Sequence, residues 1–104
     1  MLNTKSISII DGAMMLPARL KSARLHAKST QEKLGVLASI EEATVRSRVS
    51  QYESGTYRPT LEMMCAFASV LGVPESYFYT IDDDFAERIL LLYESDRIQQ
   101  KKNA

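Results

Sequence analysis

The side chains best suited to chemistry in this chain are hydrogen-bonding groups on one short segment, and they suit the reading of nucleic-acid bases. Between residues 44 and 52, Val45, Val49 and Tyr52 recur at helical spacing, so they fall on one face of a helix. The opposite face is small and polar, with an arginine on each flank. Glutamine pairs with adenine, serine and threonine with several bases, and arginine with guanine or phosphate. The base-reading candidates are Thr44, Arg46, Ser47, Arg48 and Gln51.

The groups that most enzymes and metal sites need are missing from the sequence. There is one histidine, one cysteine, and neither a CxxC nor an HExxH pattern, so we expect no metal site. The chain also lacks a glycine-rich phosphate loop and a GxSxG turn. We therefore expect no enzymatic activity and no cofactor. His26 is expected on the surface and Cys65 in the core, and a lone cysteine fits a reducing cytoplasm.

Proline, glycine and capping residues divide the 104 residues into short helices within one domain, with no strand pattern longer than four residues. Pro17 suits the first turn of a helix that continues to about Lys28. Thr30 best fits the cap of a second helix over about 30–38, although Ser29 also has capping-box spacing. Ser39 forms such a box with Glu42, which predicts a third helix over about 40–54.

Three more helices follow from the same signals. Thr60 is expected to cap the fourth, which Gly72 ends, and Pro74 to open a short fifth. The fourth helix has an apolar face of Leu61, Met64, Phe67, Ala68 and Leu71. Three aspartates at 82–84 begin a sixth helix over about 82–98, which is expected to fray near Gln99. The longest uninterrupted apolar run is six residues, so no membrane span is expected.

Two adjacent helices joined by a short turn are typical of a helix-turn-helix, and five ordered motifs are similar to one family. Residues 17–80 resemble the lambda-repressor-like (Cro/XRE-type) helix-turn-helix domain. The matching segments are RLKSAR (19–24), TQEKL (30–34), VSQYESG (49–55), RPTL (58–61) and ASVLGVP (68–74). The resemblance implies an all-α fold, a compact five-helix domain with an additional C-terminal helix.

The resemblance also assigns roles to residues outside the third helix. Gln31 corresponds to a contact with a DNA phosphate, and Tyr57 and Arg58, in the loop after the third helix, are expected to contact the DNA backbone as well. Arg24 and Glu53 correspond to a buried ion pair that fixes the recognition helix against the first helix. The base contacts and the phosphate contacts both make double-stranded DNA the expected partner.

The chain departs from the family pattern at the turn between the second and third helices. Ser39 stands where the family has glycine, and Gly35 where it usually has alanine in the second helix. Val49 follows Ser39 by ten positions, about four more than in the family. Four residues are about one helical turn, so we interpret the excess as an extension of the third helix at its start. Such an extension would shift the base-reading positions near that end.

Charge and apolar residues suggest how the chain is organised. Residues 1–60 carry a net charge of +4 and residues 61–104 a net charge of −4, which indicates a polyanion-binding part and an acidic part. We expect an arm at 1–15, a DNA-binding domain at 16–80 and a dimerisation element at 81–104, aided by the arm at Ile7–Ile10. The candidate dimer residues are Phe85, Ile89, Leu91, Leu92 and Tyr93.

These observations predict a bacterial or phage transcriptional regulator, expected in the cytoplasm with the nucleoid. It would bind a palindromic operator as a homodimer and act as a repressor, although activation is equally compatible with the sequence. Two alternatives stay open. One is the antitoxin of a toxin–antitoxin pair, and the other is a protein–protein interaction module without DNA binding. The acidic C-terminal helix would suit a protein partner in either case.

Overall fold

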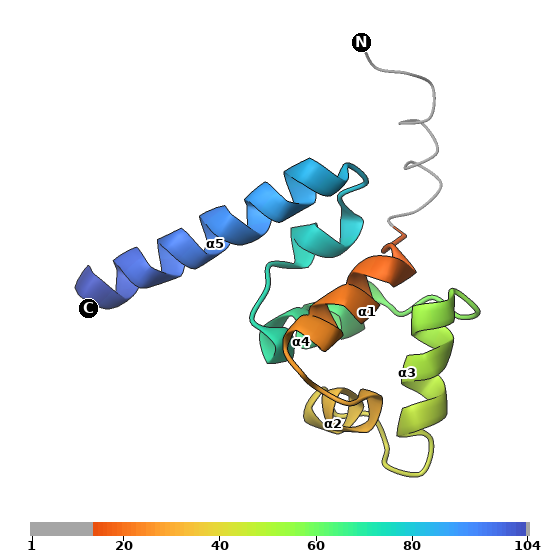
Figure 1. The fold of residues 1–104 in the computed structure, drawn as a ribbon. Helices are drawn as coiled ribbons and strands as arrows, with labels where there is room; N and C mark the ends of the chain where they lie inside the picture. The colour runs from red at the N-terminus through yellow and green to blue at the C-terminus, as the bar shows by residue number, and fades with distance from the viewer. Residues whose placement is uncertain (1–13, 104) are drawn as a thin grey trace.

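Helices make up most of residues 14–103, the part of the chain that the computed structural model describes. They are α1 (Pro17–His26), α2 (Gln31–Leu37), α3 (Val45–Ser54), α4 (Leu61–Leu71), the 3-10 helix η2 (Glu75–Tyr79) and α5 (Asp83–Asn103) (Figure 1). The predicted all-α fold with an additional C-terminal helix is confirmed. Most of the expected arm, including Ile7–Ile10, lies outside the described residues. Among the described residues, no helix is both long and apolar enough to cross a membrane.

The core lies where α1, α2, α3, α4 and η2 meet. Its largest fully buried side chains are Phe67, Phe78, Leu20, Leu34, Met64, Val45 and Val49. The predicted core face of α3 is confirmed. That of α4 is confirmed for Met64, Phe67 and Ala68, but Leu61 is exposed. Cys65 is exposed as well, so its predicted place in the core was wrong. It follows Met64 by one residue, a step of about 100° that turns its side chain away from the core.

Threonine and aspartate side chains begin three of the helices. Thr30 Oγ1 accepts a hydrogen bond from the Lys33 amide at 3.0 Å, and Thr60 Oγ1 accepts one from Met63 at the same distance. Thr30 is therefore the cap, as the spacing favoured. At the start of α5, Asp82 Oδ1 accepts from the Phe85 amide at 2.7 Å.

The last helix is longer than predicted, because it continues past Gln99 to Asn103. Glutamine and lysine are good helix formers. Two lysines in the last turn also interact favourably with the negative end of the helix dipole.

The turn between α2 and α3 corrects the sequence interpretation. Ser39 adopts a left-handed conformation, with φ 73°. Its amide donates to Val36 O at 3.0 Å and the Ile40 amide donates to Gly35 O at 2.9 Å, a pair of bonds that closes the end of α2. The predicted capping box at Ser39 is therefore wrong. The third helix begins at Val45 rather than near residue 40, and the extra residues lengthen the turn instead.

Replacing Ser39 by glycine is expected to raise the free energy of unfolding by about 1 kcal/mol. A left-handed conformation is costly for a residue with a Cβ and nearly free for glycine. Urea unfolding of the variant measures the change. Ser22→Gly is the matched control, because Ser22 lies inside α1 and glycine there should lower stability by about 1 kcal/mol. A loss of stability in Ser39→Gly would contradict the assigned turn.

One arginine of α1 holds the chain between η2 and α5. Arg19 donates to Thr80 O at 2.9 and 3.1 Å and to Ile81 O at 3.1 Å. Its guanidinium also lies 2.9 Å from the Asp83 carboxylate and 5.6 Å from the centre of the Tyr77 ring. The side chain is 14% exposed. The start of α5 is thus fixed to α1, while the rest of α5 extends away from α2 and α3 (Figure 1).

Candidate nucleic-acid interface

Helix α3 packs on the domain by one face only. Val45, Val49 and Tyr52 are buried, and the helix packs chiefly against α1 and α2. The approach to α2 is close because residue 35 is glycine. A Cβ at Gly35 would overlap Cγ2 of Val45 and would lie 3.1 Å from Cγ2 of Val49. The absence of that one atom lets α3 lie directly on α2, and the other face of α3 is turned outward.

The base-reading candidates lie on or beside that outward face. Arg46, Ser47 and Arg48 are exposed in the first turn of α3, and Gln51 is half-buried one turn later. Thr44 is exposed but precedes the helix, where its side chain makes no capping bond. The corrected start of α3 therefore places four of the five candidates in its first seven residues. In helix-turn-helix proteins the N-terminal residues of the recognition helix contact the bases.

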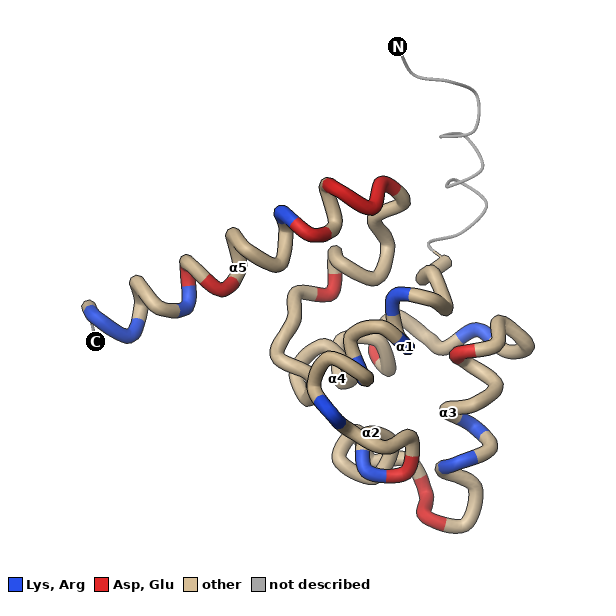
Figure 2. Tube along the Cα trace, viewed as in Figure 1, with Lys and Arg blue, Asp and Glu red and all other residues tan. Residues whose placement is uncertain are grey.

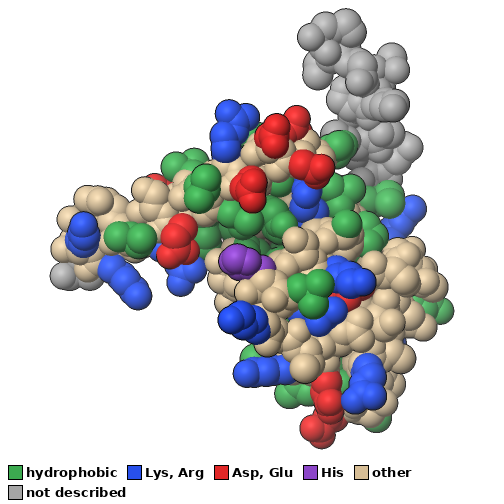
Figure 3. Space-filling view, in the orientation of Figure 1, with side chains coloured by type: hydrophobic (Ala, Val, Ile, Leu, Met, Phe, Trp, Pro, Cys, Tyr) green, Lys and Arg blue, Asp and Glu red, His purple; other side chains and the backbone are tan. Residues whose placement is uncertain are grey.

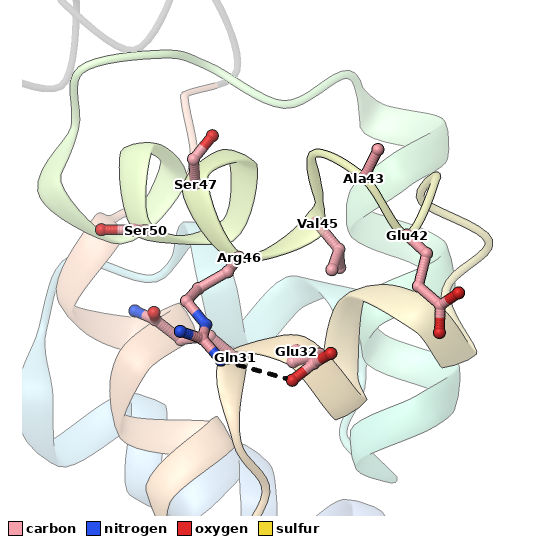
Figure 4. Close-up of a pocket in the computed structure, with 8 residues that line it drawn as sticks. All are labelled: Gln31, Glu32, Glu42, Ala43, Val45, Arg46, Ser47 and Ser50. Carbon is pink, nitrogen blue, oxygen red and sulfur yellow. Dashed lines mark ion pairs between the residues drawn. The ribbon is translucent and has the colours of Figure 1, made fainter.

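A hollow separates the start of α3 from the start of α2 (Figure 4). Its polar lining includes Gln31, Glu32, Glu42, Arg46, Ser47 and Ser50. Arg46 reaches across it to Glu32, with 3.5 Å between Nη2 and Oε1. Arg48 lies on the other flank of α3, beside Thr44 and Met63. The two arginines thus occupy opposite sides of the outward face, as the 100° steps predicted.

The second half of α3 is fixed by a buried polar network. Arg24 Nε lies 2.6 Å from Glu53 Oε2, and its Nη2 donates to Glu53 Oε1 at 3.1 Å. Gln31 Nε2 donates to the same Oε1 at 3.0 Å, and Arg24 Nη1 donates to Ser29 O at 2.8 Å. The Glu53 side chain is only 4% exposed. One carboxylate of α3 therefore joins α1 to α2, and Arg24 also binds the turn between them.

The remaining phosphate candidates follow α3. Tyr57 is 56% exposed and Arg58 is exposed as well. The amides of Thr56 and Tyr57 both donate to Gln51 O, at 2.9 and 3.2 Å, so this loop is held against the end of α3. Gln31, the third phosphate candidate, lines the hollow at the start of α2, and its amide nitrogen donates to Glu53.

Sequence reasoning did not foresee how many carboxylates border this face. Glu41 and Glu42 are exposed in the turn that precedes α3, and Glu32 lies on α2 (Figure 2). The sequence interpretation placed residues 41 and 42 inside the third helix, so it did not show that Glu42 lies near Arg46 and Glu41 near Arg48. Ser50, which lines the hollow, did lie near the outward face in the 100° steps but was not among the candidates.

Comparisons with known proteins agree with this geometry. A family model described as helix-turn-helix matches residues 20–78. Among solved structures, the chain is similar to the crystal structure of the transcriptional regulator BswR, with a TM-score of 0.74 and 31% sequence identity. That similarity covers 86% of this chain and 95% of the other chain. No match was found among curated proteins.

Proposed function

This chain belongs to the helix-turn-helix family, as the match over residues 20–78 shows, and we propose that this DNA-binding regulator recognises a specific operator. In this proposal α3 enters the major groove and its outward face reads the bases. The observation that carries the proposal is that this face is uncovered, polar at its centre and flanked by Arg46 and Arg48.

The contacts divide into those that read sequence and those that position the protein. Ser47 and Gln51 are the central readers, and Arg46 and Arg48 reach the groove edges on either side. Thr44 contacts DNA from the turn before the helix. Tyr57, Arg58 and Gln31 contact phosphates at the two ends of the recognition face and carry no sequence information themselves.

The regulator acts in the cytoplasm as a homodimer on a palindromic operator, and it represses by occupying that site. One domain covers one half-site, which gives too little selectivity among the many competing sites of a genome. Two domains related by a twofold axis would bind half-sites about 34 Å apart, one turn of DNA. The dimerisation element is residues 81–104, which contain α5.

Gln51→Ala and Arg58→Ala are expected to weaken DNA binding in different ways. Gln51→Ala should cost about 1–3 kcal/mol on the preferred operator and relax specificity at one base pair. Arg58→Ala should weaken binding to all sequences alike and reduce the salt dependence by about one unit. Binding titrations on operator and scrambled DNA over a range of salt concentrations measure both effects. Equal sequence profiles for the two variants would contradict this division of contacts.

Selection of bound sequences from a random DNA pool tests the function as a whole. We expect enrichment of an inverted repeat whose half-sites are one turn apart. The control is a variant with Ser47 and Gln51 both replaced by alanine, which keeps the charges and should lose the enrichment. If the wild-type protein enriches no DNA sequence from the pool and has no DNA affinity, the proposal is wrong. The protein–protein interaction module is then the better interpretation.

A further inference from the structure

Helix α5 carries more apolar surface than its own domain covers. Ala86 is 1% exposed, and Ile89 and Leu90 are half-buried against the domain. Four other apolar side chains of α5 are exposed: Phe85 (51%), Leu91 (66%), Leu92 (63%) and Ile98 (48%). Hydrophobic side chains remain visible along α5 in the surface view (Figure 3). The domain therefore uses one side of α5 and leaves apolar residues of another side in contact with solvent.

Phe85 and Leu92 belong to one face of the helix, whereas Leu91 and Ile98 lie about 100–120° around it from Leu92. In steps of 100° per residue, Phe85, Arg88, Asp96 and Gln99 all lie within about 40° of Leu92. That line is about 120° around the helix from Ala86, which faces the domain. We call these five residues the Leu92 face. Arg88 lies over the Phe85 ring, 5.4 Å from its centre, so an aromatic ring and a guanidinium share the face.

The charges of α5 and its capping residue reverse sign about Leu92. If the segment is laid against itself in the opposite direction with Leu92 at the centre, every pair of charged residues is opposite in sign. The pairs are Asp82 with Lys102, Asp83 with Lys101, Glu87 with Arg97 and Arg88 with Asp96. Only the last pair lies on the Leu92 face. If Leu91 of one copy is instead placed opposite Ile98 of the other, Arg88 falls opposite Lys101 and like charges meet there.

We propose that the Leu92 face binds the same face of a second copy of this chain, with the two α5 helices antiparallel and Leu92 at the twofold axis. In this arrangement Arg88 of each copy pairs with Asp96 of the other copy, and Phe85 packs beside Gln99. The inference rests on the proposed homodimer and specifies its interface and register. A segment that is complementary to itself is what a twofold interface requires.

Exchange of the paired charges tests the register. Arg88→Asp alone and Asp96→Arg alone should each weaken the dimer at least about tenfold, because like charges then meet at two places. A mixture of the two variants should form a heterodimer, since both contacts between positions 88 and 96 then join an aspartate to an arginine. The double exchange in one chain should restore the homodimer. Sedimentation without DNA measures all four samples.

Changes elsewhere on α5 serve as controls. Lys101→Asp and Glu94→Arg make the same changes of charge on the opposite side of the helix and should leave the dimer intact. Leu92→Glu should produce a folded monomer, because that side chain is already exposed. The proposal is overturned if the wild-type chain is monomeric at high micromolar concentration, if the mixed variants stay apart, or if Leu91→Glu dissociates the dimer and Leu92→Glu does not.

These outcomes are independent of DNA recognition. Gln51→Ala is expected to remain dimeric in sedimentation, whatever it does to operator binding. If the chain dimerises through the Leu92 face but enriches no DNA sequence, the proposed function fails and the interface stands. If an operator is enriched and the chain stays monomeric, the interface fails and the DNA-binding function stands.

Discussion

Replacing Arg24 by methionine is expected to lower the free energy of unfolding by about 3–5 kcal/mol. The change removes the guanidinium that lies 2.6 Å from the Glu53 carboxylate, whose side chain is 4% exposed. Glu53 would then remain buried with the Gln31 amide as its donor. The Ser29 carbonyl would also lose its 2.8 Å bond. Breaking a buried ion pair on one side costs more than the pair itself contributes, because an uncompensated charge is left behind.

A double variant separates the ion pair from the packing of the two side chains. Arg24→Met with Glu53→Leu should recover much of the lost stability, because both charges are then removed. Urea unfolding of the wild-type protein, the two single variants and the double variant completes the cycle. Arg46→Met is the matched control. Its partner Glu32 is 51% exposed and Arg46 itself 77% exposed, so the pair is a surface one. That control should change stability by no more than about 1 kcal/mol. Additive losses in the Arg24–Glu53 cycle would contradict the coupling.

Replacing Gly35 by alanine is expected to destabilise the fold by about 1–3 kcal/mol, although alanine is the better helix former. The new Cβ would overlap Cγ2 of Val45, a core side chain that is 2% exposed. Helix α3 would have to move away from α2, and the outward face would move with it. The variant should therefore also lose operator affinity, which a binding titration can follow.

The same contact predicts a rescue. Val45→Ala alone should cost stability, because it leaves a cavity in the core. Added to Gly35→Ala, it removes the overlapping methyl group, so the double variant should be more stable than Gly35→Ala alone. Lys33→Ala, at an exposed position of α2, is the control and should change stability by less than about 0.5 kcal/mol. If Gly35→Ala is neutral, the close approach of α2 and α3 is wrong.

Helix boundaries that depend on local chemistry could be predicted from the sequence. Thr30 and Thr60 are caps because a hydroxyl can reach an amide three residues later, and Gly55 and Gly72 end helices because glycine accepts positive φ. The predicted start of α3 was wrong because Ser39 and Glu42 have the spacing of a capping box but do not form one. Serine gives no signal that it will adopt a left-handed conformation, and that conformation ends α2 instead.

The outward face of α3 could be predicted because it depends only on the helical spacing of the apolar residues. Burial of Val45, Val49 and Tyr52, which recur every three or four residues, determines which side of α3 is exposed, whatever the neighbouring helices are. Contacts between helices could not be predicted in the same way. The approach of Arg46 to Glu32 and of Gln31 to Glu53 depends on the crossing angle between α2 and α3. The residue spacing within either helix does not determine that angle.

Helix α1 contacts both the recognition helix and the start of the C-terminal helix, through two arginines five residues apart. Arg24 binds Glu53 of α3, and Arg19 binds the backbone and the aspartate at the start of α5. The two surfaces are thus both fixed to one helix. If a partner on α5 tilts α1 and thereby changes the affinity of α3 for DNA by some factor, DNA changes the affinity for that partner by the same factor. Each surface would then report occupancy of the other.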